Sequence, residues 1–266
     1  MYRKKMMIPL VSVTVVVGAL AVVTLFKKNQ ACKSFCAGCN GCKNLQDKSV
    51  SYYVDKEARL QNDLQKKQKL FKPALTRYYG AGAIDGIVEE TKAEFQRLVA
   101  GIPYIGGDKN PMTEDIEQAA MALALYRVQK RHGRTTQEIG EIITGSIQRE
   151  IEGYPKWLRH IVGGKFFTEK YKREQCDNCA ESQKREWAGN WVSFYVEGDG
   201  TAFDYGFDHA ECGIVKYLTV NGASDIIPYL CSLDFIYSDA FDEGLTRTTT
   251  LAENGPRCDF RYKRKD

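Results

Sequence analysis

The chain has 266 residues and a formal net charge of +4, and its basic character belongs to its first residues. Residues 1–48 carry eight Lys and Arg against one Asp, so the rest, with 30 basic and 33 acidic side chains, has a net charge of −3. A weakly acidic globular part gives no indication of a nucleic-acid partner. About 215 residues beyond residue 48 are enough for one domain with a sizeable core.

The chain begins with a basic segment, residues 1–5, and an uncharged apolar run, residues 6–26. At about 1.5 Å per residue, this run would span roughly 30 Å as a helix, the thickness of a hydrocarbon core. It is longer than the apolar part of a cleaved signal. We therefore expect an uncleaved single-pass membrane anchor, with the lipid bilayer as a partner. Basic residues on both sides are nearly balanced and do not set its orientation.

A cysteine-rich tether, residues 27–48, follows the predicted anchor. Four thiols at this spacing suit an iron–sulfur cluster or a thiolate-bound zinc ion. Acylated or merely reduced cysteines in a juxtamembrane linker are the alternative. The four residues are Cys32, Cys36, Cys39 and Cys42. The nine cysteines of the whole chain follow no secreted disulfide framework, which favours a reducing compartment and a cytoplasmic globular part.

Helices are expected in the next part of the chain. Residues 49–74 are strongly charged with sparse leucines and suggest a solvated helical stalk. Helical spacing of apolar residues then predicts helices over residues 87–102 and 111–133. The capping-box pattern of Thr135 and Glu138 predicts a further helix that ends at Gly153. A short helix from Pro155 to Gly164 completes this half.

The pattern changes near Trp187 to one typical of an antiparallel sheet with helices. Residues 191–197 alternate like a strand, a Gly-Asp-Gly turn follows, and residues 201–208 form the returning strand. Residues 210–218 and 225–241 are expected to be helices, and residues 245–251 and 258–263 a closing hairpin. The fold class is therefore α+β: a helical N-terminal half and a C-terminal antiparallel sheet with helices, preceded by one transmembrane helix, with the main domain over residues 75–266.

Cysteines and acids recur together in the last third of the chain. The candidates are His209, Glu211, Cys212, Cys231, Asp234, Cys258 and Arg261, with Arg247 nearby. Two or three thiolates with a carboxylate or imidazole could hold zinc and activate water. Alternatively, one cysteine attacks as a thiolate with a neighbouring base. The third possibility is three ordinary buried cysteines, with acids that cap helices or pair with the arginines. A further pair, Cys176 and Cys179, lies in a segment expected to be a charged loop.

Four segments of the chain resemble the L-2-amino-thiazoline-4-carboxylic acid hydrolase family. They are IPYIGGDKNPM, VEGDGTAFDYGFDHAEC, PYLCSLDF and GLTRTTTLAENGPRCDFRY, and the resemblance covers roughly residues 75–262. It implies hydrolytic opening of a 2-aminothiazoline ring to a carbamoyl-cysteine, with a small molecule as substrate. For this reaction we expect Glu211, Cys212, His209 and Asp234 to be catalytic, and Arg247 or Arg261 to hold the substrate carboxylate.

A weaker resemblance is to the 4-vinyl reductase type of small-molecule-binding domain, which holds zinc with one glutamate and several cysteines. By this analogy Glu211, Cys231 and Cys258, with Cys212 as a fourth ligand, would bind zinc. Two other functions remain open at this point. One is a non-catalytic binding or sensory domain built on such a zinc site. The other is a membrane redox or metal-handling protein that uses the Cys32–Cys42 cluster.

Overall fold

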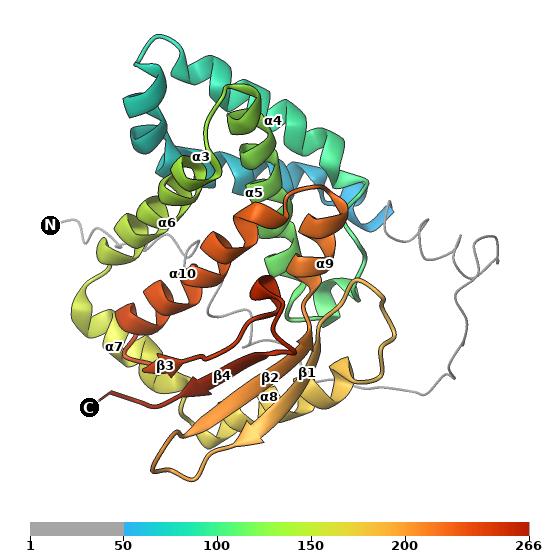
Figure 1. The fold of residues 1–266 in the computed structure, drawn as a ribbon, viewed down its shortest axis with the longest axis vertical. Helices are drawn as coiled ribbons and strands as arrows, with labels where there is room; N and C mark the ends of the chain where they lie inside the picture. The colour runs from blue at the N-terminus through green and yellow to red at the C-terminus, as the bar shows by residue number, and fades with distance from the viewer. Residues whose placement is uncertain (1–50, 266) are drawn as a thin grey trace, which may run out of the picture.

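A computed structural model describes residues 51–265, in which helices form one layer and a sheet forms the other (Figure 1). The predicted membrane anchor and the cysteine-rich tether lie outside these residues. The first six helices of the described part are α3 (Glu57–Tyr79), α4 (Ile84–Val99), α5 (Thr113–Arg131), α6 (Thr136–Glu152), α7 (Lys156–Lys165) and α8 (Glu169–Ser182). Between residues 51 and 265, no helix combines the length and the apolar character that crossing a membrane requires.

The second half of the described chain alternates strands with helices. Its strands are β1 (Val192–Glu197), β2 (Tyr205–Glu211), β3 (Leu245–Thr246) and β4 (Cys258–Tyr262), and its helices are α9 (Gly213–Val220) and α10 (Ile227–Ala240). The strands form one antiparallel sheet in the order β1-β2-β4-β3. Helix α8 packs on β1, and α10 packs on α6. The predicted α+β fold, with helices first and an antiparallel sheet last, is confirmed.

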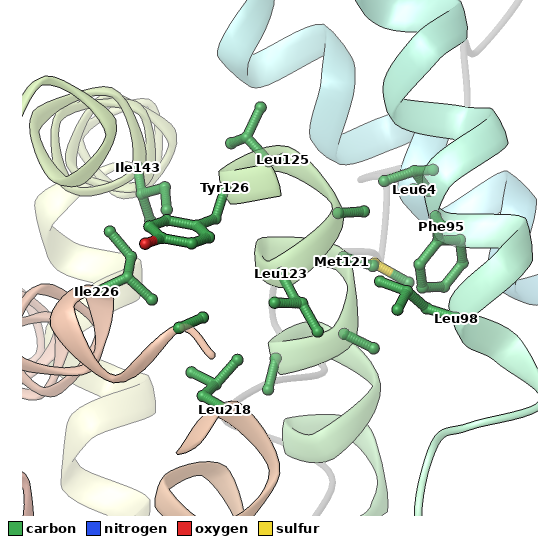
Figure 2. Close-up of a cluster of buried hydrophobic side chains, with 14 of the residues drawn as sticks. Leu64, Phe95, Leu98, Met121, Leu123, Leu125, Tyr126, Ile143, Leu218 and Ile226 are labelled. Carbon is green, nitrogen blue, oxygen red and sulfur yellow. The ribbon is translucent and has the colours of Figure 1, made fainter. Parts of the chain in front are cut away.

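Helix α5 is the centre of the hydrophobic core (Figure 2). Its apolar side chains point to both sides: Met121 lies toward Phe95 and Leu98 of α4, and Tyr126 lies toward Ile143 of α6. A helix whose buried residues surround it on several sides cannot be amphipathic, and such a helix is normally found inside a domain. Because α5 lies at the centre of the domain, the acidic side chains of its first turn face the interior.

The prediction of a solvated stalk over residues 49–74 was wrong. Helix α3 does form there, but it packs against α4 and α6. Leu60 and Leu64 are 0% and 2% exposed, and they share one face of the helix with Phe71 and Leu75. Their spacing of four, seven and four residues is that of an apolar stripe, which the many charged residues between them obscured. This helix is part of the domain's core.

Several local predictions are confirmed by the helix ends. The capping box at the start of α6 is present, with the Thr135 hydroxyl accepting from the Glu138 N–H and the Glu138 carboxylate accepting from the Thr135 N–H. Helix α7 begins directly after Pro155 as expected. The segment with Cys176 and Cys179 is the helix α8 and not a loop, so the expectation for that segment was wrong.

The end of strand β2 differs from the prediction in a way that matters for the site. Strand β2 runs to Glu211 instead of ending at Asp208, and the next helix starts only at Gly213. His209 therefore lies in the sheet, opposite Ser193 of β1 on one side and Cys258 of β4 on the other. The closing hairpin is confirmed, although its first strand is only Leu245–Thr246.

Candidate active site

A cavity of about 720 Å³ lies between the inner face of the sheet and helices α5, α8 and α10. We call it the thiol chamber, because Cys212, Cys231 and Cys258 all line it. Its volume is typical of a pocket for a small organic ligand. Three elements distant in sequence thus bring the predicted cysteines to one place, as the sequence predicted for the group.

The three cysteines are neutral thiols in this environment. Burial raises the pKa of Cys212 to about 11 and that of Cys231 to about 12, and it also raises the pKa of Cys258. The backbone N–H groups of Val215 and Ile214 at the start of α9 act in the opposite direction on Cys212 but do not prevail. A nucleophilic cysteine needs a lowered pKa. The thiol chamber therefore offers soft, polarisable walls and no preformed thiolate.

Asp234 and Arg247 form the main ion pair of the thiol chamber. Arg247 Nη1 lies 2.6 Å from Asp234 Oδ2, and Nη2 donates to the Cys231 carbonyl oxygen at 2.9 Å. The arginine side chain is 4% exposed and lies between the rings of Phe235 and Phe260, with ring centroids at 4.9 and 4.8 Å. The Asp234 side chain is 40% exposed, and it lines the chamber. Burial raises its pKa to about 6, although Arg247 opposes this rise.

Asp115, in the first turn of α5, is a second carboxyl group on the same chamber. Burial, with smaller contributions from the neighbouring charges of Glu114 and Asp234, raises its pKa to about 7. Among residues 51–265 its side chain has no hydrogen-bond or ion-pair partner. The chamber therefore holds two carboxyl groups in different environments: Asp234 is paired with Arg247 and is the more acidic, whereas Asp115 is unpaired and holds its proton more tightly.

His209 lines the thiol chamber beside Cys258. Its Nδ1 lies 2.7 Å from the Ser193 hydroxyl oxygen, and its ring stacks on Phe207 with centroids 5.9 Å apart. Burial lowers its pKa to about 4, so the imidazole is neutral at physiological pH. Ser193 is 4% exposed and also lines the chamber. The hydrogen bond to Ser193 and the stacking on Phe207 hold the imidazole of His209 in a fixed orientation beside the cavity.

Two predicted site residues do not reach the chamber. Glu211 forms ion pairs with Arg185 and Lys216, which fasten the loop before β1 to the start of α9. Arg261 donates to Asp208 Oδ1 at 2.9 Å and to the Phe207 carbonyl oxygen at 3.2 Å. Because side chains alternate along a strand, Arg261 and Asp208 lie on the face opposite Cys258 and His209. Neither Glu211 nor Arg261 lines the thiol chamber.

The residues proposed as zinc ligands do not form a metal site as they stand. In the part of the chain that the structure describes, no three His, Cys, Asp or Glu side chains are grouped closely enough to hold a metal ion. Glu211, the expected oxygen ligand, is held away by Arg185 and Lys216. We therefore derive no catalytic step through zinc. The four tether cysteines lie outside the described residues, so their metal site stays a prediction.

A comparison with protein-family models identifies the relatives of this chain. The model of the L-2-amino-thiazoline-4-carboxylic acid hydrolase family matches residues 113–262. The chain belongs to this family. No curated protein and no solved structure gives a significant match.

The match to the L-2-amino-thiazoline-4-carboxylic acid hydrolases starts at the first residue of α5 and ends at the last residue of β4. It is shorter than the expected 75–262, but it contains the two aspartates, the three cysteines, His209 and Arg247 described for the thiol chamber. Helices α3 and α4 lie before it. From that earlier segment Tyr52 and Tyr104 contribute to the chamber wall, in edge-to-face contact with each other, and Tyr104 in turn meets Trp187.

Sequence reasoning missed two residues of the site, Asp115 and Ser193. An acid in the first turn of a helix is so common, because it complements the helix dipole, that Asp115 carried no distinguishing signal. Ser193 could have been found, since strand alternation places it on the same face as Tyr195, and antiparallel pairing of β1 with β2 brings it opposite His209.

Proposed function

We propose that this hydrolase opens a small cyclic amidine that carries a carboxylate, with 2-amino-thiazoline-4-carboxylate as the reference substrate. Family membership supplies the reaction class. The observation that carries the proposal is the pair of carboxyl groups, Asp234 and Asp115, which line one chamber beside the buried Arg247 and have raised pKa values of about 6 and about 7. Enzymes use such pairs as a general base and a general acid.

Arg247 is the proposed anchor for the substrate carboxylate. Its guanidinium has five N–H donors, of which Asp234 and the Cys231 carbonyl use only part. The rings of Phe235 and Phe260 hold it in place, so it binds the carboxylate with little loss of conformational freedom. In the proposed binding mode, the amidine carbon of the five-membered ring then lies near the two aspartates.

Water is the proposed nucleophile, because the chamber's thiols are protonated. Asp234 takes a proton from a water molecule. The oxygen of that water bonds to the carbon between nitrogen and sulfur of the protonated amidine. The resulting tetrahedral carbon collapses by breaking its bond to sulfur, and the sulfur takes the electron pair and a proton from Asp115. The protonated urea group then returns a proton to Asp115, Asp234 releases its proton to solvent, and the product is a carbamoyl-cysteine.

The test is turnover of 2-amino-thiazoline-4-carboxylate by the full chain, measured as release of a free thiol. Replacing Asp234 by Asn should lower kcat by about 10² to 10⁴, the usual contribution of a general base. Asp239→Asn on the same helix is the matched control, since its side chain is 75% exposed and forms an ion pair with Lys265 away from the chamber. Full activity of Asp234→Asn, or binding without thiol release by the unmodified chain, would refute the proposed function.

A further inference from the structure

A second cavity of about 360 Å³ adjoins the thiol chamber on the side of α5 and α10. The two share part of their walls, including Met112, Asp115 and Asp234. We call this second cavity the acidic chamber, since Glu114 and Glu243 also line it. The proposed chemistry at Asp234 and Asp115 takes place at the common wall, and it uses neither of these glutamates.

Glu243 is a partly buried acid. It follows α10, and in the described part of the chain its carboxyl group has no hydrogen-bond or ion-pair partner. Burial raises its pKa to about 7, and its charge raises the pKa of Tyr171 and Tyr262, which also line the acidic chamber. The basic residue in the chamber wall, Lys67, lies 3.8 Å from Glu150 and so has an acid of its own.

An enclosed acid without a counterion is costly to a folded protein. Acids with strongly raised pKa values cluster at functional sites, where a ligand can supply the missing positive charge. The walls of the acidic chamber suit a cation in a second way, because the faces of tyrosine rings attract ammonium groups. Tyr171, Tyr237 and Tyr262 all line the chamber. Acid and aromatic walls together indicate an organic cation.

The combined size of the chambers exceeds that of the reference substrate. Amino-thiazoline-carboxylate has about nine non-hydrogen atoms, which at roughly 30 Å³ each, the share of a water molecule in the liquid, occupy no more than roughly 270 Å³. The thiol chamber alone has about 720 Å³, and the acidic chamber adds about 360 Å³. A ligand that fills both is several times larger than the bare ring.

We propose that the natural substrate is an extended cyclic amidine whose reacting ring lies in the thiol chamber and whose alkyl-ammonium tail lies in the acidic chamber beside Glu243. The inference rests on the proposed function for the position of the ring. The two chambers meet at Asp115 and Asp234, so the tail leaves the ring near its amidine carbon. An exocyclic nitrogen substituent has this direction.

The test uses two versions of 2-amino-thiazoline-4-carboxylate, one with an aminobutyl chain on the exocyclic nitrogen and one with an uncharged butyl chain. Calorimetry gives the Kd of each for the full chain, independently of turnover. A charge-assisted contact contributes about 1.5–3 kcal/mol, so the aminobutyl compound should bind at least about tenfold more tightly than the butyl compound. The ratio of their kcat/KM values should favour it in the same direction.

Replacing Glu243 by Gln should reduce the binding ratio to roughly threefold or less, since it removes the charge and keeps the shape. Glu89→Gln is the matched control, because this glutamate is 71% exposed on α4, and it should leave the ratio unchanged. Equal binding of the two compounds, or a ratio that survives Glu243→Gln, overturns the proposal. If the ratio is found but neither compound is hydrolysed, the tail site stands and the proposed hydrolysis fails.

Discussion

Replacing Asp115 by Asn should make the protein more stable and less active. The carboxyl group is enclosed, lies near Glu114 and Asp234, and has no cation partner among the described residues. Its pKa rises from an ordinary value of 3.8 to about 7. Because the folded state holds this proton more tightly than the unfolded state, the group lowers stability as pH rises from about 4 to about 7 and adds no further loss above that range.

The size of the effect follows from the pKa change. A rise from 3.8 to about 7 corresponds to about 4 kcal/mol, since each tenfold change in proton affinity is about 1.4 kcal/mol. The effective dielectric constant of such a site is well above that of a dry interior, so about half of this, about 2 kcal/mol, is expected. Asparagine keeps the shape and cannot ionise. For a domain of this size, the melting temperature at pH 8 should rise by roughly 4–8 °C.

Urea unfolding of both proteins between pH 4.5 and pH 8 measures this difference. The free-energy gap between Asp115→Asn and the unmodified protein should widen steadily up to about pH 7 and then stay constant. Thiol release from 2-amino-thiazoline-4-carboxylate should fall by about 10² or more, because the proposed acid is lost. A gap that does not change with pH, or a variant that is less stable at pH 8, would show that Asp115 is not an unpaired buried acid.

Three further predictions follow from the same geometry. Arg247→Ala should destabilise the fold by about 2–3 kcal/mol in urea unfolding. This is at the lower edge of the range for a broken buried pair, because the partner, Asp234, faces a cavity. The same substitution should move the acidic limb of the pH–rate profile to higher pH, because the pKa of Asp234 rises. Glu211→Gln should retain turnover within about threefold and cost about 0.2–1 kcal/mol, since its pairs are partly exposed; loss of activity would return Glu211 to the site. Gly163→Ala should destabilise by about 1–3 kcal/mol in a thermal melt, because a Cβ there overlaps the backbone carbonyl of Phe241 just after α10. Gly145→Ala in α6 should instead stabilise by about 0.5–1 kcal/mol, because a Cβ there makes only an ordinary contact, 3.5 Å from Arg149 Nη1. Equal effects of the two substitutions would contradict the packing.

Local patterns predicted much of the fold because they act over a few residues. The capping box at Thr135 and the proline at the start of α7 fixed helix ends that the structure confirms. Helix α3 was assigned correctly as a helix but wrongly as a stalk. Burial depends on which other element covers the face of Leu60 and Leu64, and that partner, α4 and α6, is a property of the whole fold.

In the site, too, local patterns could be predicted from the sequence and tertiary contacts could not. The cysteines at 212, 231 and 258 line one cavity, because a strand end, a helix face and a second strand converge on it. Strand alternation alone excludes Arg261 from the face of Cys258, since the two are three residues apart in β4. The tertiary pairing of Glu211 with Lys216 and Arg185, by contrast, could not be inferred from the sequence, because it depends on the path of the loop before β1.

The central claim is that Asp234 and Asp115 act together in the thiol chamber to add water to a cyclic amidine. The most direct measurement is the pH dependence of kcat/KM for 2-amino-thiazoline-4-carboxylate with the full chain. The account predicts a bell-shaped profile whose limbs lie near pH 6 and pH 7, the pKa values of Asp234 and Asp115, with the acidic limb lost in Asp234→Asn and the basic limb lost in Asp115→Asn. A profile that rises toward pH 11, the pKa of the Cys212 thiol, and is unchanged by both substitutions would contradict it and point to a thiolate nucleophile.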